Sequence, residues 1–210
     1  TGHGGKDRIH DAFEIWKYWQ SRGSRETIIV GFSRGAVIAR EFANQISDEG
    51  GKVDFLGLYD SVGSFGNPLN MVDIGYRKSL PSGVAYCAQA LSIHEERFTF
   101  RVIRATLAKT NNQTKIEECW FPGVHSDIGG TLKKGLGAAT LDWMFDQAIK
   151  ANTKQWDKNA RIEAKNNVNC DEEPSKNKIS LPASFLKRLR TRTINKDDSK
   201  CCENKDIETE

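Results

Sequence analysis

The stretch Thr27-Ile28-Ile29-Val30-Gly31-Phe32-Ser33-Arg34-Gly35 decides the fold of this chain. Its first four residues are all β-branched, which is typical of a buried parallel strand. A serine between two glycines follows, and residues 36–43 have the composition of a helix start. A strand, a G-x-S-x-G turn and a helix together predict a nucleophile elbow, which presents the Ser33 hydroxyl at the carboxyl end of the strand.

The tightness of such a turn explains why glycines would stand on both sides of the serine. We expect a side chain at Gly31 or Gly35 to collide with the neighbouring strand or helix, and Ser33 to adopt a strained backbone conformation. The backbone N–H of Arg34 would then face a developing oxyanion. An ordinary strand–turn–helix corner can carry the same letters, so the interpretation also requires a base and a carboxylate elsewhere in the chain.

The composition of the 210 residues narrows the class of protein. This length fits one domain with an appendage. A net charge of +3 is too small to favour nucleic acid as a partner. The sequence has no apolar run of about 18 residues that would span a membrane and no signal-peptide pattern. We therefore predict a cytoplasmic location in the producing cell.

The cysteines are five in number and follow no metal-ligand spacing. An odd number in a chain without a secretion signal predicts reduced thiols rather than disulfides or a metal site. An exposed redox pair at Cys201-Cys202 is the alternative. We expect neither a metal nor an organic cofactor. The five are Cys87, Cys119, Cys170, Cys201 and Cys202.

The chain opens with a glycine-rich stretch, Gly2-His3-Gly4-Gly5. It resembles the H-G-G-G oxyanion loop of lipases, which makes Gly4 a candidate for a second oxyanion donor. The alternative is a simple lead-in to a helix. That helix is predicted to be capped by Asp7 and to end near Gly23, and its apolar residues recur at helical spacing from Ile9 to Trp19.

A second strand is predicted over residues 53–59, and Asp60 follows it directly. An acidic residue at the carboxyl end of a parallel strand lies where α/β enzymes keep their chemistry. Asp60 is therefore a candidate for the carboxylate that orients a catalytic histidine, or else an Asx-turn cap. Residues 64–82 are predicted to form a long loop that serves as a lid or substrate wall. Residues 85–93 fit either a strand or a helix.

A histidine follows the strand predicted over residues 115–121, within Pro122-Gly123-Val124-His125-Ser126-Asp127-Ile128-Gly129-Gly130. A serine nucleophile needs such a base, and the chain order Ser33, Asp60, His125 is that of α/β-hydrolases. Asp127 is a rival for the carboxylate, or it fixes this loop by accepting hydrogen bonds from backbone N–H groups.

The composition changes after a helix predicted over residues 136–151. Residues 157–178 are mostly Lys, Asn, Glu and Asp, which cannot bury enough surface to fold alone. Residues 181–194 form a short basic amphipathic stretch that fits either a docked surface helix or contact with an anionic membrane or a partner. The last sixteen residues are predicted to be disordered.

Three motifs together resemble a known family. They are G-F-S-R-G-A at residues 31–36, G-L-Y-D-S-V-G-S at 57–64 and W-F-P-G-V-H-S-D-I-G-G at 120–130. Over about residues 1–150 they are similar to the DUF2235 α/β-hydrolases, which include the first class of type VI secretion lipase effectors. The resemblance implies that Ser33, Asp60 and His125 form a catalytic triad that hydrolyses phospholipid esters.

The resemblance also implies an architecture. We expect an α/β-hydrolase-like domain over residues 1–152, with a mostly parallel sheet flanked by helices, and a charged extension over 153–210. The strand ending in an F-D-G-T-like motif, with which the family opens, is absent from the sequence. An effector of this kind would act on a membrane surface, leave the cell by the type VI route, and have an immunity or carrier partner.

Two other functions stay open at this point. A small-molecule carboxylesterase would use the same three residues with a smaller pocket. A catalytically inactive α/β-hydrolase fold would serve as an interaction module instead.

Overall fold

The computed structural model describes residues 4–63, 75–97, 99–111, 113–132, 134–154, 157–175, 192, 200 and 201. Its centre is an all-parallel sheet in the order β1-β2-β3-β4. The strands are β1 (Ile28–Phe32), β2 (Val53–Tyr59), β3 (Val84–Ser92) and β4 (Lys115–Phe121). This arrangement confirms the predicted α/β class.

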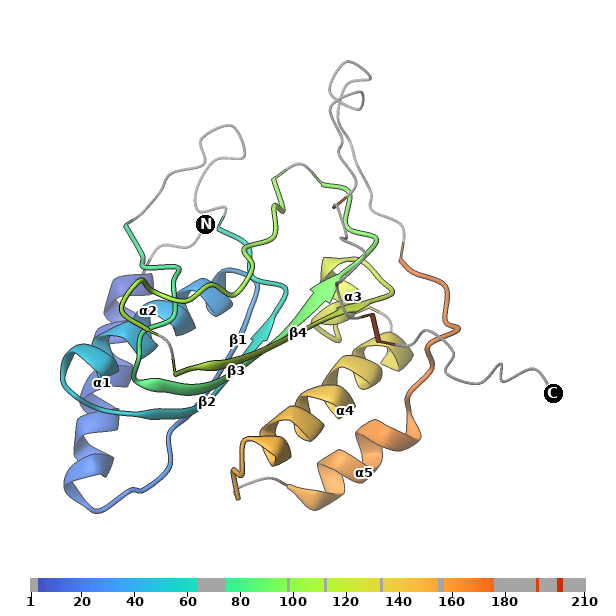
Figure 1. Cartoon of the computed structure of the whole chain (residues 1–210). Coiled ribbons are helices and arrows are strands. Elements are labelled where there is room, and N and C mark those ends of the chain that lie inside the picture. The colour runs from blue at the N-terminus through green and yellow to red at the C-terminus, as the bar shows by residue number, and fades with distance from the viewer. Residues whose placement is uncertain are drawn as a thin grey trace.

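Helices cover both faces of this sheet (Figure 1). On one side α2 (Arg34–Asp48) packs on β1 and β2, and α1 (Gly5–Ser21) packs on α2. On the other side α4 (Lys134–Lys150) packs on β2, β3 and β4, and α5 (Lys158–Asn166) packs on α4. The short helix α3 (His125–Ile128) follows β4. Because both faces are covered, β2 and β3 read as nearly continuous buried runs.

The register of the strands brings their carboxyl ends to one edge. Phe32 pairs with Tyr59, Tyr59 pairs with Ala90, and Ser92 pairs with Phe121. The residues that follow these positions therefore emerge side by side. This is the physical reason why Ser33, after β1, lies near Asp60, after β2.

The apolar core is divided by the sheet into two layers. One layer joins α2 to the sheet through residues such as Ala36, Ile46 and Leu56. The other joins α4 to the opposite face through residues such as Phe55 and Met144. The loops at the carboxyl ends of the strands therefore extend from a sheet that is packed on both faces.

Several local expectations are settled by the structure. Residues 85–92 of the stretch 85–93, which fitted a strand or a helix, belong to the inner strand β3. Helix α1 begins at Gly5 after an N-cap at Gly4, so Asp7 lies in its first turn and does not cap it. The apolar face predicted for α1 is buried at Ile9, and Phe13 and Trp16 pack against the core, whereas Trp19 is 56% exposed.

The prediction of reduced cysteines is wrong. Cys119 on β4 forms a disulfide with Cys201, and their Cα atoms lie 6.0 Å apart. Cys170 is also disulfide-bonded, and Cys87 is a buried free thiol. The two members of the Cys119–Cys201 pair are separated by 82 residues, so only the folded chain brings them together.

Two described residues near the C-terminus are attached to strand β4. The backbone N–H of Cys201 donates to Trp120 O at 2.8 Å, and Lys200 forms a β-bridge with Trp120. These two residues contradict the prediction of disorder at their positions. The amphipathic stretch 181–194 lies outside the described residues except for Arg192. No helix in the described ranges is long and apolar enough to cross a bilayer.

Candidate active site

Ser33 lies at the sharp turn between β1 and α2. Its φ of 60° and ψ of −127° lie outside the regions that L-residues favour, as the elbow interpretation predicted. A Cβ atom on Gly31 would lie 2.6 Å from Gly35 O, so glycine is required there. A Cβ on Gly35 would meet no atom within 4 Å, so the expected collision at Gly35 is wrong. The serine N–H donates to Tyr59 O at 2.9 Å, which ties the turn to β2.

Ser33, His125 and Asp60 form one chain of hydrogen bonds. The Nε2 atom of His125 lies 2.8 Å from Ser33 Oγ, and its Nδ1 atom lies 2.7 Å from Asp60 Oδ2. His125 is 3% exposed and Asp60 is fully buried. The histidine ring therefore joins a hydroxyl at one nitrogen to a carboxylate at the other, in a site largely closed to water.

Two aromatic rings fix the plane of His125. The ring of Phe32 stacks on it at 4.6 Å between centroids, and Phe100 meets it edge-on at 4.8 Å. A Cβ atom on Gly129 would lie 2.5 Å from the Phe32 ring, so a glycine there leaves room for this stack. Sequence reasoning did not identify either phenylalanine.

A buried carboxylate holds the backbone of His125. Glu95 Oε2 accepts a hydrogen bond from the His125 N–H at 3.2 Å. The same carboxylate binds Arg97, whose guanidinium lies over the ring of Phe100. Sequence reasoning also missed Glu95, although its place just after β3, at the carboxyl edge of the sheet, is a usable signal.

Asp127 contacts the backbone of residues 122–130, which we call the histidine loop, rather than the His125 ring. Its Oδ2 atom accepts hydrogen bonds from Val124 N and Ser175 N, each at 2.9 Å, and its Oδ1 atom accepts one from the Ser175 hydroxyl at 2.7 Å. His94 supports the same loop, because its Nδ1 atom accepts the Gly123 N–H at 2.9 Å. Of the two roles left open for Asp127, these contacts match the fixing of the loop.

The second oxygen of Asp60 is also bonded. Asp60 Oδ1 accepts the N–H of Ser92 at 3.0 Å and lies 2.5 Å from Arg192 Nη1. Burial by itself would raise the pKa of Asp60, but the hydrogen bonds and charges of His125 and Arg192 outweigh it and hold this pKa below its usual value. No motif in the sequence pointed to Arg192.

The two expected oxyanion donors have different surroundings. Arg34 is the first residue of α2, so its N–H has no acceptor within the helix and lies at the positive end of the helix dipole. Gly4 has a left-handed φ of 79° at the N-cap of α1. Its neighbour Gly5 packs against Tyr76 and Ile38, and the role of Gly4 stays a prediction.

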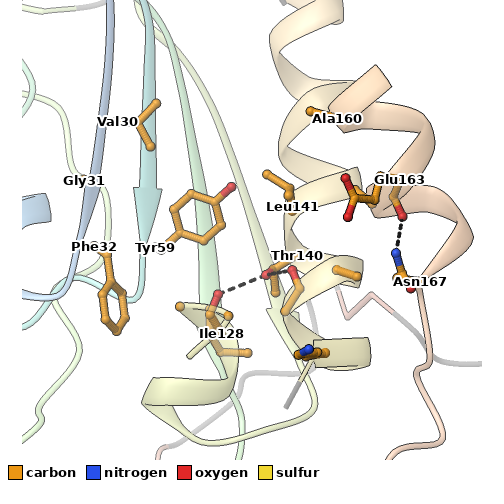
Figure 2. Close-up of a pocket in the computed structure, with 16 residues that line it drawn as sticks. Val30, Gly31, Phe32, Tyr59, Ile128, Thr140, Leu141, Ala160, Glu163 and Asn167 are labelled. Atoms are coloured by element: carbon orange, nitrogen blue, oxygen red, sulfur yellow. Dashed lines mark hydrogen bonds between the residues drawn. The ribbon is translucent and has the colours of Figure 1, made fainter. Parts of the chain in front are cut away.

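A pocket of about 750 Å³ lies between β1 and helices α4 and α5. Figure 2 shows the residues that line it. One wall contains Val30, Phe32 and Tyr59, and the other contains Leu141 and Glu163. Phe32 belongs both to this pocket and to the stack on His125. Among the described strands β1 pairs with β2 alone, so the other edge of β1 is unpaired within this sheet. Val30, which lines the pocket, is 52% exposed.

A parallel sheet that carries a nucleophile elbow and a histidine-bearing loop at its carboxyl edge is the arrangement of α/β-hydrolases. Residues 3–147 match the family model described as "T6SS, Phospholipase effector Tle1-like, catalytic domain". The chain belongs to this family of phospholipase effectors of the type VI secretion system. The resemblance inferred from the three sequence motifs is thereby confirmed.

A solved structure is also similar to this chain. It is the crystal structure of an uncharacterized protein from Pseudomonas aeruginosa, with 25% sequence identity and a TM-score of 0.49. The match covers 78% of this chain and 30% of that chain. The present chain therefore spans less than a third of the length of that protein. No curated protein matches the chain significantly.

Proposed function

We propose that this chain is a serine hydrolase that cleaves the acyl ester bonds of phospholipids. The observation that carries the proposal is the continuous hydrogen-bond chain from the Ser33 hydroxyl through His125 to buried Asp60. A serine hydroxyl at an ordinary pKa is a weak nucleophile, and an adjacent base that is itself oriented by a third group activates it. Family membership supports the phospholipid as substrate.

The reaction assigns one task to each of the three residues. Ser33 Oγ attacks the ester carbonyl, while His125 Nε2 takes the hydroxyl proton and later gives it to the leaving alcohol. Asp60 keeps the Nδ1 proton on the histidine and stabilises the imidazolium that forms. Water then attacks the acyl-enzyme, with His125 as its base, and releases the fatty acid.

The negative charge that develops on the carbonyl oxygen requires donors. The N–H of Arg34, at the start of α2, is the first donor in this proposal, and Gly4 is a candidate for the second. Removing one such donor from a hydrolase costs about 100- to 1,000-fold in kcat. The family also supports a membrane surface as the site of action and an immunity or carrier protein as partner.

Vesicles of mixed phospholipids provide the test. Purified wild-type protein should release fatty acid and lysophospholipid, quantified by mass spectrometry, and Ser33→Ala should release neither above background. Ser21→Ala is the matched control, because Ser21 is an exposed serine at the end of α1. Its hydroxyl donates to the backbone carbonyl of Tyr18, in the same helix. Equal release by wild type and Ser33→Ala would contradict the proposal.

A further inference from the structure

Asp60 is shared between His125 and a residue from the far end of the chain. Arg192 Nη1 lies against Asp60 Oδ1, the oxygen that does not face the histidine. The side chain of Arg192 is 6% exposed and that of Asp60 is fully buried. A buried guanidinium in contact with a buried carboxylate is costly to desolvate, so both groups depend on their hydrogen bonds.

The guanidinium of Arg192 is fixed by more than Asp60. Its Nη1 atom also donates to Ser92 O at 3.1 Å, and its Nη2 atom donates to Phe100 O at 2.7 Å. Ser92 ends β3, and its N–H donates to the same Asp60 oxygen. Phe100 carries the ring that lies edge-on to His125. Arg192 therefore joins three elements that surround the proposed base.

The chain on both sides of Arg192 is attached near the same site. Upstream, Ser175 binds Asp127 of the histidine loop through its N–H and its hydroxyl. Downstream, Cys201 is joined to β4 by the disulfide with Cys119 and by a backbone hydrogen bond to Trp120. These attachments are independent of the Arg192 contact, and they limit the distance that Arg192 can move away from Asp60.

We propose that Arg192 is a positioning residue for Asp60, and that the Cys119–Cys201 disulfide holds it in place. The proposal rests on the proposed function of Ser33, Asp60 and His125. In a buried site, loss of Arg192 would favour the protonated form of Asp60, which has no negative charge to stabilise the imidazolium of His125. The C-terminal extension is thus part of the hydrolytic site, and reduction of its disulfide weakens that site.

The effect of the cation on the histidine works in the opposite direction. The positive charge of Arg192 opposes the formation of the imidazolium, which Asp60 stabilises. In this proposal the gain from the correct orientation of Asp60 outweighs this charge effect, because misplacement of a catalytic group by about 1 Å can cost about 100-fold in rate. Within the described residues, the charged or titratable groups that bond Asp60 are His125 and Arg192.

The first test is a double-mutant cycle on hydrolysis of a soluble fluorogenic ester. Arg192→Gln should lower kcat by about 10- to 100-fold while KM changes little. In an Asp60→Asn background the same substitution should have almost no effect, because no carboxylate remains to be positioned. Arg192→Lys should recover part of the loss, and Arg22→Gln, at the exposed end of α1, should behave as wild type.

The second test concerns the disulfide. A dithiol supplies two electrons and two protons to Cys119–Cys201, which becomes two thiols while the dithiol becomes a disulfide. Treatment with dithiothreitol should lower the kcat of wild type to that of Arg192→Gln, and should leave Arg192→Gln unchanged. Cys119→Ala, which lacks this disulfide alone, should show the same loss without reductant.

Thermal unfolding measures the contact between Arg192 and Asp60 independently of ester hydrolysis. Arg192→Gln should lower Tm more in wild type than in Asp60→Asn, whether or not an ester is hydrolysed. If wild type hydrolyses no ester, the proposed function fails and the positioning role fails with it. If wild type is active but the two substitutions lower kcat by factors that simply multiply, or if reduction leaves kcat unchanged, the proposal for Arg192 alone is overturned.

Discussion

Ser175 donates both its backbone N–H and its hydroxyl to the carboxylate of Asp127, at 2.9 and 2.7 Å. Asp127 also accepts the N–H of Val124 and lies two residues after His125. The histidine loop is therefore fastened by a residue that lies 48 positions further along the chain. This contact makes the stability of the loop depend on the C-terminal part of the protein.

The first prediction concerns this fastening. Asp127→Ala leaves three donors without their acceptor in a buried site, so we expect the free energy of unfolding to fall by about 2–4 kcal/mol. Ser175→Ala removes only the hydroxyl donor and should cost about 1 kcal/mol. Urea denaturation followed by circular dichroism measures both. A Ser175→Ala variant less stable than Asp127→Ala would contradict this description of the loop.

The second prediction concerns the carboxylate of Asp60. Asp60→Asn is nearly the same size, but its amide cannot stabilise the imidazolium and favours the wrong histidine tautomer. We expect kcat on a soluble ester to fall by about 1,000- to 10,000-fold. An unchanged far-ultraviolet circular dichroism spectrum is the control for folding. A loss below about tenfold would remove Asp60 from the mechanism.

The third prediction follows from the lowered pKa of Asp60. Because the folded-state pKa lies below the unfolded value of about 3.9, ionised Asp60 stabilises the fold above about pH 4, and this contribution is lost as pH falls through the folded pKa. Wild-type Tm should therefore decrease as the pH is lowered below about 4. The decrease should be smaller in Asp60→Asn, which cannot titrate at this position. Parallel curves for the two proteins would contradict the assignment.

The fourth prediction compares the two glycines of the elbow. Gly31→Ala places a methyl group 2.6 Å from Gly35 O and should destabilise the protein by several kcal/mol or prevent folding. Gly35→Ala meets open space inside a helix, where alanine is favoured over glycine by up to about 1 kcal/mol. Thermal unfolding of the two variants should therefore show opposite signs.

The fold and the central residues of the site were accessible from local patterns. Ser33 and Asp60 each directly follow a strand, and His125 lies on the loop after another, so the parallel sheet places them at one edge. The G-x-S-x-G motif, the strand positions and the chain order led to these residues, although Asp127 stayed a rival for the carboxylate. The same reasoning erred at Gly35, since the requirement for glycine there cannot be judged without the neighbouring backbone.

The remaining contacts depend on tertiary structure, and the sequence does not indicate which residues form them. Arg192 lies 132 positions from Asp60, and its segment was identified only as basic and amphipathic. The odd total of five cysteines led to the prediction of reduced thiols. An odd total is compatible with a disulfide between Cys119 and Cys201, because Cys87 is a free thiol buried in the core. Glu95 binds the backbone of His125, a contact that sequence spacing cannot indicate.

The most direct test of the central claim is covalent labelling with a fluorophosphonate, which reacts with a serine that a neighbouring base activates. Intact mass and peptide mapping should find one adduct per chain, on Ser33, at neutral pH. Ser33→Ala should take up no label, His125→Ala should react at least about 100-fold more slowly, and Ser21→Ala should react as wild type. An adduct on another residue, or labelling of Ser33 at an unchanged rate in His125→Ala, would contradict the claim that Ser33 is the nucleophile activated by His125.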